Sequence, residues 1–325
     1  MLKKFLKRIL KENGSIYRML RQIHEELHRK YKKERLKNHG RLHPDKTFFV
    51  IRAESETGGL MSYYNSNIGW IAYALRRGWI PVIDMQNFKN PYLSEQMLHR
   101  QNAWEYYFRQ PFDYVLEEVY QSRHVILSSG KPNQTASPRL QGKRLKNPQY
   151  LKKTSNIIRK YMRLNDDMKK CAEENAQKLL GGGIGIGVVS RGTDLLGYPG
   201  HSRQPETSEL IHLTRDRMKK WKADFIFLAT EEEKVIRQFE EEFGKGVIRY
   251  NKAEKFDDYN SRILAEVSFD REHDEFLKGW EYLITVLLLA RCHYLIGTYV
   301  GASVAAVAIN GGKYRDTCLI DLGIY

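Results

Sequence analysis

Short apolar runs alternate along the chain with longer segments whose apolar residues recur every three or four positions. The short runs, rich in β-branched residues, predict buried strands, and the longer segments predict amphipathic helices. Strands are expected at 48–51, 79–83, 125–127, 184–189, 225–228, 294–296 and 319–322, and helices at 60–75, 141–180, 206–221, 279–290 and 304–309. This order predicts an α/β protein with mainly parallel sheets.

The length of 325 residues predicts two domains, each large enough for its own core. The boundaries that we expect are a basic helical extension over 1–46, an N-terminal α/β domain over 47–150, a helical connection over 151–180 and a C-terminal α/β domain over 181–325. A composition of 42% hydrophobic and 29% charged residues is that of an ordinary folded protein.

Positive charge is concentrated at the N-terminus. Residues 1–46 contain 15 Lys and Arg against 5 Asp and Glu, which leaves 39 against 34 for the rest of a chain whose net charge is +15. One predicted helical face is apolar: Leu2, Phe5, Leu6, Ile9 and Leu10. Two interpretations stay open, a solvated helix packed on the body or an amphipathic helix on an anionic membrane surface. Lysines interrupt every apolar run, which argues against a signal peptide or a membrane span, and no nucleic-acid-binding fold is recognisable.

The three cysteines, Cys171, Cys292 and Cys318, form no CxxC pair and no cluster with histidine. An odd number without such spacing predicts neither a disulfide framework nor a zinc site. A reducing cytoplasm is therefore the expected compartment, with peripheral attachment to the inner face of the membrane as the alternative that the basic N-terminus leaves open.

The stretch 181–205 is the strongest candidate for chemistry. Three glycines lead into an apolar strand, which ends at a polar group: Ser190, Arg191, Thr193 and Asp194. Open α/β sheets bind ligands beyond the carboxyl ends of their strands, and an arginine there can clamp a phosphate. The alternative is an ion pair between Arg191 and Asp194.

The run Val-Ser-Arg-Gly-Thr-Asp at 189–194 resembles the first motif of the fucosyltransferase superfamily, which includes core α1,6-fucosyltransferases, nodulation-factor fucosyltransferases and protein O-fucosyltransferases. Val189 and Gly192 stand where that motif has histidine and a second arginine. Gly200, His201, Gln204 and Pro205 extend the similarity to a bacterial branch associated with surface polysaccharide, over most of 47–325. The resemblance implies a GT-B type fold of two Rossmann-like domains.

The same resemblance implies further donor-binding residues. Thr230 and Glu231 match an Ala-Thr-Asp-Asp motif that contacts the nucleoside, although capping of the following helix is an equal explanation. The turn with Thr298, Tyr299, Gly301 and Ser303 precedes a predicted helix, whose first backbone amides suit a diphosphate. Together with Arg191, Thr193 and Asp194, these residues form the expected donor site.

The implied activity is inverting, metal-independent transfer of fucose from GDP-fucose to a glycan acceptor, either free or lipid-linked, in capsular or exopolysaccharide synthesis. No Asp-x-Asp motif occurs in the chain, so we expect Arg191 and the helix start near Ser303 to neutralise the leaving diphosphate without a metal or cofactor. His201 is the candidate general base, since histidine titrates near neutral pH; a loop histidine without a catalytic part is the alternative. Glu281 matches a Glu-Tyr-Leu of the bacterial branch, or is an ordinary acid at a helix N-terminus.

Acceptor-binding candidates lie in the N-terminal half. Glu54 and Glu56 follow the first strand, and Trp104 and Tyr106 belong to a dense aromatic stretch. Aromatic rings stack on sugars, although an aromatic core beneath a long loop explains the same pattern.

Other functions remain to be weighed. A dinucleotide enzyme is disfavoured, because the glycines at 181–187 lie before and within the strand, whereas a dinucleotide loop follows its strand. Transfer from a different nucleotide sugar stays open, as does a non-catalytic membrane-associated protein of polysaccharide assembly.

Overall fold

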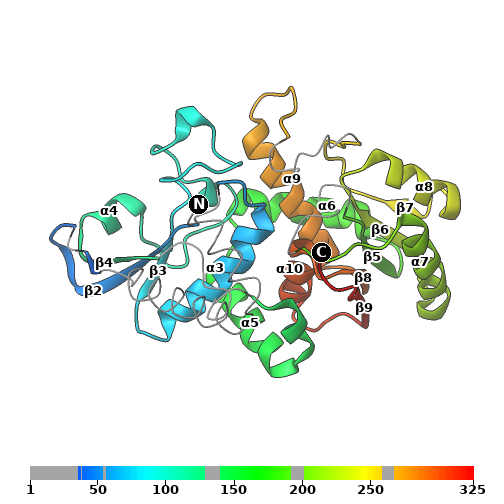
Figure 1. Cartoon of the computed structure of the whole chain (residues 1–325), viewed down its shortest axis with the longest axis horizontal. Coiled ribbons are helices and arrows are strands. Elements are labelled where there is room, and N and C mark those ends of the chain that lie inside the picture. The colour runs from blue at the N-terminus through cyan, green and yellow to red at the C-terminus, as the bar shows by residue number, and fades with distance from the viewer. Residues whose placement is uncertain (1–35, 38, 54–55, 129–139, 192–200, 258–266) are drawn as a thin grey trace, which may run out of the picture.

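The computed structural model describes residues 36–37, 39–53, 56–128, 140–191, 201–257 and 267–325. Two sheets lie at opposite ends of an elongated molecule, with helices between them (Figure 1). The first sheet has the order β1-β4-β2-β3, and the second has the order β7-β6-β5-β8-β9. Every described strand pair is parallel except β1 with β4. The predicted α/β class with mainly parallel sheets is confirmed.

The element bounds follow the chain order. The strands are β1 (Leu36–Lys37), β2 (Leu42–Ile51), β3 (Ile80–Ile83), β4 (Ser122–Leu127), β5 (Gly185–Val189), β6 (Phe225–Ala229), β7 (Ile248–Arg249), β8 (Tyr294–Thr298) and β9 (Asp316–Ile320). The α-helices are α3 (Leu60–Leu75), α4 (Leu116–Tyr120), α5 (Pro148–Tyr161), α6 (Asp166–Leu180), α7 (Thr207–Trp221), α8 (Glu233–Phe243), α9 (Asp274–Leu289) and α10 (Gly301–Asn310). Short 3-10 helices are η1 (Glu95–Met97), η2 (Ala103–Tyr106) and η3 (Gly142–Lys146). None of the described helices combines the length and the apolar character needed to cross a membrane.

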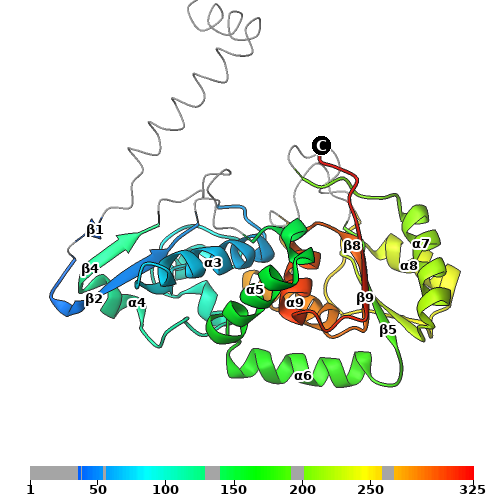
Figure 2. The same cartoon turned by 90° about the horizontal axis from the view of Figure 1, so that it is seen from below.

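One hydrophobic core joins the two sheets. Strand alternation puts Phe49 of β2 on the face toward the second sheet, and the same buried cluster contains Phe227 of β6 and Leu283 of α9. Helix α6 runs beneath both halves (Figure 2) and packs against α9. We expected a separate core for each half. The structure shows a shared cluster, because α3, α9 and α10 fill the space between the sheets, and each half also has a smaller cluster of its own, around Val50 in the first and Ile226 in the second.

Two boundaries differ from the expectation. Residues predicted as the end of a helical extension are strand, since β1 lies at Leu36–Lys37 and β2 begins at Leu42. The early part of β2 is mostly exposed, so it has no apolar alternation to reveal it. Helix α9 begins at Asp274 rather than at 279, because acids in its first turn favour a helix start. The predicted apolar helix at 2–10 lies outside the described residues.

Candidate functional site

A cavity of about 690 Å³ opens between the two sheets. Its wall on the side of the first sheet is the loop after β2 and the first turns of α3. The opposite wall is built from the residues that follow β5, β6 and β8, and one face of α9 closes the cavity. This is the carboxyl edge of the second sheet, where open α/β sheets bind ligands.

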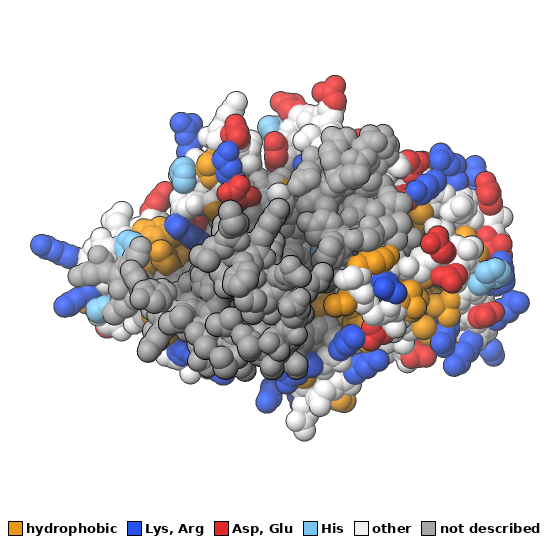
Figure 3. Space-filling model, viewed as in Figure 1, with side chains coloured by type: hydrophobic (Ala, Val, Ile, Leu, Met, Phe, Trp, Pro, Cys, Tyr) orange, Lys and Arg blue, Asp and Glu red, His pale blue; other side chains and the backbone are white. Residues whose placement is uncertain are grey.

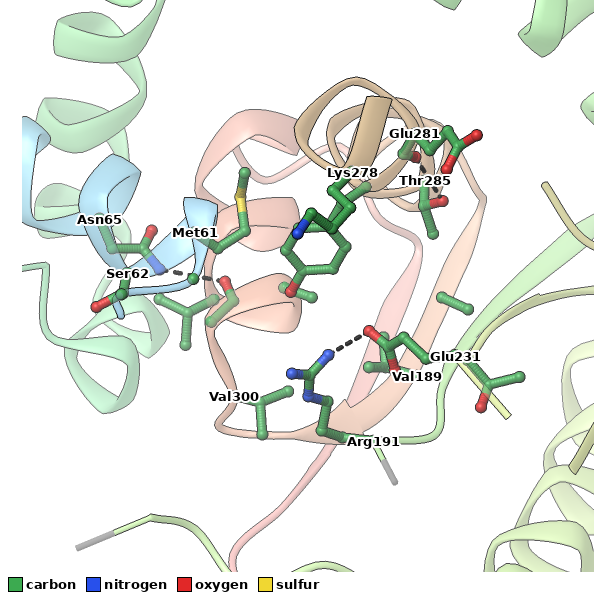
Figure 4. A pocket seen from close by; sticks show the side chains of 18 of the residues that line it. Met61, Ser62, Asn65, Val189, Arg191, Glu231, Lys278, Glu281, Thr285 and Val300 are labelled. Carbon is green, nitrogen blue, oxygen red and sulfur yellow. Dashed lines mark hydrogen bonds and ion pairs between the residues drawn. The ribbon is translucent and has the colours of Figure 1, made fainter. Parts of the chain in front are cut away.

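Arg191 and Glu231 form the centre of the second wall. Strands β5 and β6 pair in parallel with Val189 beside Ala229, so the residues two positions further on lie next to each other. The Arg191 guanidinium donates a hydrogen bond to Glu231 Oε1, and the two side chains face each other in Figure 4. Both are mostly buried, at 17% and 18% exposure. The described partner of Arg191 is thus Glu231; Thr193 and Asp194 lie outside the described residues.

A second ion-pair group projects from α9 and the segment before it. Arg271 donates to both carboxylate oxygens of Glu281, at 2.8 and 3.0 Å, and its Nε donates to Asp274 at 2.8 Å. Lys278 contacts Asp274 at 3.3 Å and lines the cavity. Glu281 lies two turns inside α9, so the interpretation as an ordinary helix N-terminal acid is wrong. Arg271 and Lys278 belong to no sequence motif, so it is the fold that shows them in the cavity lining.

Lys255 adds a cation beside β6. Its ammonium donates to the carbonyl of Thr230 at 3.0 Å and to that of Asn251 at 3.4 Å. Burial lowers the pKa of Lys255, and Glu231, Glu233 and Glu281 oppose this shift. Among the described residues, the hydrogen bonds of this partly buried cation go to carbonyl oxygens, so it is well suited to receive an anion.

The start of α10 supplies backbone donors. The N-terminal amides of a helix lack partners within the helix, and Gly301 and Ala302 line the cavity. Asn65 of α3 fixes this turn, because its Nδ2 donates to the carbonyl of Gly301 at 3.1 Å. A Cβ on Gly301 would lie 3.2 Å from Met61, so glycine lets the two helix starts approach closely.

Some predicted donor residues do not reach the cavity. Thr298 and Ser303 are 1% and 0% exposed, and Thr298 donates to Gln204 at 2.8 Å. Strand and helix geometry turns both side chains into the core, so the expectation that these side chains contact the donor is corrected. Tyr299, Gly301, Thr230 and Glu231 do line the cavity.

The predicted acceptor residues lie away from the cavity. Trp104 is 0% exposed and stacks on Phe108 at 4.1 Å, so its assignment to sugar binding is wrong and the aromatic-core interpretation holds. Tyr106 donates to Gln101 at 2.6 Å and is not part of the lining. Glu56 is exposed outside the cavity, and Glu54 lies outside the described residues.

His201 lines the cavity at its edge. Its backbone carbonyl accepts a hydrogen bond from the amide of Tyr325 at 3.1 Å, and Arg203 donates to the carbonyl of Gly323 at 3.0 Å. The segment at 323–325 therefore runs antiparallel to the segment that carries His201 and holds its backbone in place.

The chemistry of the lining favours an anionic ligand. Over the described residues, five cations reach the cavity against the three carboxylates of Glu231, Glu254 and Glu281: Lys143, Arg191, Lys255, Arg271 and Lys278. No group of three or more His, Cys, Asp or Glu in the described part of the chain is arranged to hold a metal ion.

Comparison with known proteins identifies the fold of this chain. No family model and no curated protein matches the chain. Among solved structures, the apo-form of POFUT1 superposes with a TM-score of 0.50 and 10% identity, over 85% of this chain and 98% of that one. The chain shares the fold of POFUT1. NodZ α1,6-fucosyltransferase soaked with GDP-fucose gives a TM-score of 0.49 at 16% identity, over 81% of this chain and 93% of that one. NodZ from Bradyrhizobium gives a TM-score of 0.47 at 17% identity, over 80% of this chain and 92% of that one. The likeness to POFUT1 confirms the predicted α/β fold. The relationship to the fucosyltransferase superfamily stays a prediction.

Proposed function

We propose that the chain is a glycosyltransferase that moves fucose from GDP-fucose to a glycan acceptor with inversion. The observation that carries the proposal is the position of Arg191 beside the start of α10, at the carboxyl edge of the second sheet and in a cavity whose lining has more cations than carboxylates. POFUT1 and NodZ, which share this fold, have been solved with GDP-fucose. The motif at 189–194 supports the same donor.

In the proposed reaction, the bond between fucose C1 and the donor phosphate breaks as the acceptor oxygen attacks C1 from the opposite face. Arg191, Lys255 and the first amides of α10 stabilise the negative charge that collects on the departing GDP. Thr193, Asp194, Thr230, Glu231 and Tyr299 are proposed to hold the nucleotide. The protein groups supply this neutralisation in the proposal, so no metal takes part.

The proton of the acceptor hydroxyl passes in the proposal to His201, because histidine is the side chain whose ordinary titration range is near neutral pH. Glu281 is less suited to this step, because Arg271 already donates to both of its oxygens. We assign Glu281 to positioning Arg271 at the cavity wall. The acceptor is proposed to belong to a bacterial surface polysaccharide, on the similarity at 200–205, and the basic residues 1–46 are proposed to bring the enzyme to the inner face of the membrane.

Calorimetry against GDP-fucose, GDP-mannose, UDP-glucose and GDP tests the donor. We expect GDP and GDP-fucose to bind, and Arg191→Ala to lose about 2 kcal/mol of binding free energy, typical of a charged hydrogen bond. Arg191→Lys should recover little, since the fork geometry is lost. Arg215→Ala is the matched control, because Arg215 pairs with Glu242 away from the cavity.

Equal GDP affinity in Arg191→Ala and the native protein would overturn the assignment of the donor site. Tighter binding of a UDP-sugar would instead favour the second candidate, transfer from a different nucleotide sugar. That candidate is supported by Val189 and Gly192, which replace a histidine and an arginine of the family motif.

A further inference from the structure

The net positive charge of the chain beyond residue 46 comes from one short segment. Residues 141–163 contain eight Lys and Arg and no Asp or Glu. Outside this segment and outside 1–46, the chain has 31 Lys and Arg against 34 Asp and Glu. The remainder of the body is therefore slightly acidic, and η3 with α5 accounts for all of its surplus positive charge.

Most of these cations are exposed on one surface, which we call the basic surface: Lys143, Arg144, Lys146, Lys152, Lys153, Arg159 and Lys160. On α5, Lys152 and Arg159 are seven residues apart, as are Lys153 and Lys160, so the four share the solvent face opposite the buried Thr154 and Ile158. Figure 3 shows Lys and Arg side chains at the edge of the molecule where α5 lies.

The basic surface lacks the carboxylates that usually accompany such a cluster. Within the described residues, Lys143 pairs with Asp321 at 2.6 Å, and the other six have no carboxylate at ion-pair distance. Like charges that neighbour one another on a helix destabilise it. A cluster without compensating acids therefore costs the fold stability, and binding of an anion would relieve that cost.

The basic surface begins at the cavity. Gly142 and Lys143 line the cavity, and the ammonium groups of Lys143 and Lys146 lie 5.9 and 5.8 Å from the ring centre of Tyr299, a cavity residue. From there, α5 continues outward for 14 residues, or about 21 Å at 1.5 Å per residue. A chain that leaves the cavity on this side passes along a row of cations.

We propose that the basic surface binds an acidic glycan, so that the acceptor of the proposed transferase carries carboxylate or phosphate groups. This inference rests on the proposed function for the identity of the acceptor. A lipid surface fits less well, because membrane-bound helices insert apolar side chains, and the exposed large hydrophobic residues of the described chain all lie off η3 and α5.

The test uses the full chain without donor and a fluorescent oligogalacturonate as the acidic glycan. Its affinity is measured by anisotropy for the native protein and for Lys152→Gln/Lys153→Gln/Arg159→Gln/Lys160→Gln. Glutamine keeps the helix preference of lysine and arginine, and circular dichroism and melting check the fold. The control is Lys169→Gln/Lys170→Gln/Lys178→Gln on α6, three exposed lysines whose helix also carries Asp166, Asp167, Glu173 and Glu174.

The native protein should bind the oligosaccharide with an affinity that falls as salt rises. The α5 variant should bind roughly 15-fold more weakly, at about a factor of two for each exposed ion pair lost, while the α6 control binds like the native protein. GDP binding should be the same in all three, which separates this proposal from that of the donor site.

Equal affinity of the native protein and the α5 variant for the oligosaccharide would overturn the proposal. So would a preference for vesicles of phosphatidylglycerol, or for single-stranded RNA, over the acidic glycan when each competes with the labelled probe. Loss of GDP binding in Arg191→Ala with oligosaccharide binding intact supports both assignments; absence of GDP binding in the native protein overturns the proposed function alone.

Discussion

Arg191 already has a partner in the cavity, because Glu231 accepts its hydrogen bond. A donor diphosphate brings more negative charge than one carboxylate, and it can accept from both terminal nitrogens of the guanidinium. Binding of the donor would therefore replace part of the Arg191–Glu231 contact and release Glu231 for the hydroxyls of a ribose. The ion pair keeps the arginine oriented in the cavity wall.

We expect Lys255 to make the proposed GDP affinity depend on pH. Burial lowers the pKa of its ammonium below 10.5, so its charge is lost in milder alkali than that of a free lysine. We expect the difference in GDP affinity between native protein and Lys255→Met to shrink as pH rises toward 10. Calorimetry at several pH values measures it, and comparing the two proteins cancels the titration of GDP itself.

The stability of the free protein should change with pH in the opposite direction to its GDP affinity. Between the lowered pKa of Lys255 and about 10.5, the unfolded chain binds more protons than the folded one, so this lysine makes the free protein more stable as pH rises. Lys255→Met should remove that contribution from the pH dependence of melting. Equal GDP affinity of the native protein and Lys255→Met at neutral pH would show that Lys255 does not contact the nucleotide.

Individual cavity residues differ in how far the sequence reveals them. Arg191 was predictable, because a lone arginine directly after a buried apolar run stands at the carboxyl end of a strand. Arg271 and Lys278 were not, since a cation in a polar segment acquires a role only when α9 places it beside β5 and β6. Trp104 was misassigned because aromatic residues in a long loop have the same sequence pattern whether they cover a core or bind sugar.

At the scale of elements, the packing of α9 on the first half depends on Gly279. A Cβ at this position would lie 2.2 Å from the hydroxyl of Tyr107, which donates to the carbonyl of Phe276 at 2.9 Å. We expect Gly279→Ala to lower the free energy of unfolding by about 1–3 kcal/mol through overpacking, although alanine favours a helix by about 1 kcal/mol.

Denaturant unfolding measures this change, and Tyr107→Phe provides the control. Removing the hydroxyl costs one hydrogen bond but takes away the atom closest to the new Cβ, while the ring carbon that bore it stays close. Gly279→Ala should therefore be partly better tolerated in the Tyr107→Phe background than in the native one. Additive effects of the two substitutions would contradict the predicted clash.

The segment at 323–325 holds the segment that carries His201 in position. The amide of Tyr325 donates to the carbonyl of His201, and proline at this place removes that donor. Tyr325→Pro should lower kcat while GDP affinity is retained, because the base is displaced and the donor site is untouched. The control is Ile324→Ala, whose native side chain is 65% exposed; native turnover in Tyr325→Pro would exclude this positioning role.

Whether a segment is helix or strand was predictable where burial imposes a regular spacing on its apolar residues. The ends of an element were not predictable where polar residues extend it. The helix at 60–75 has the predicted bounds, because apolar positions cover its whole length. The strand β2 begins six residues before the expected start, in a mostly exposed stretch whose pairing with β4 shifts register between Leu42 and Thr47. The start of β2 is fixed by its hydrogen bonds to β4, and the local sequence pattern of β2 does not encode those bonds.

At the scale of the whole molecule, the shared core couples the two sheets. Phe49 of β2, Phe227 of β6 and Leu283 of α9 belong to one buried cluster, so neither half can unfold without exposing apolar surface of the other. Length, the helical connection at 151–180 and the family resemblance all predicted two domains, and none of them shows whether the helices between two sheets merge part of their cores.

We therefore expect a single cooperative melting transition in calorimetry, with equal calorimetric and van't Hoff enthalpies. GDP at 100 times its Kd should stabilise the entire protein by about 2.7 kcal/mol, because the cavity walls come from both halves. Arg191→Ala at the same GDP concentration should shift the transition less, which ties the stabilisation to the cavity. Two separate transitions, of which GDP raises only one, would mean that the halves unfold independently and that the contacts between them contribute little to stability.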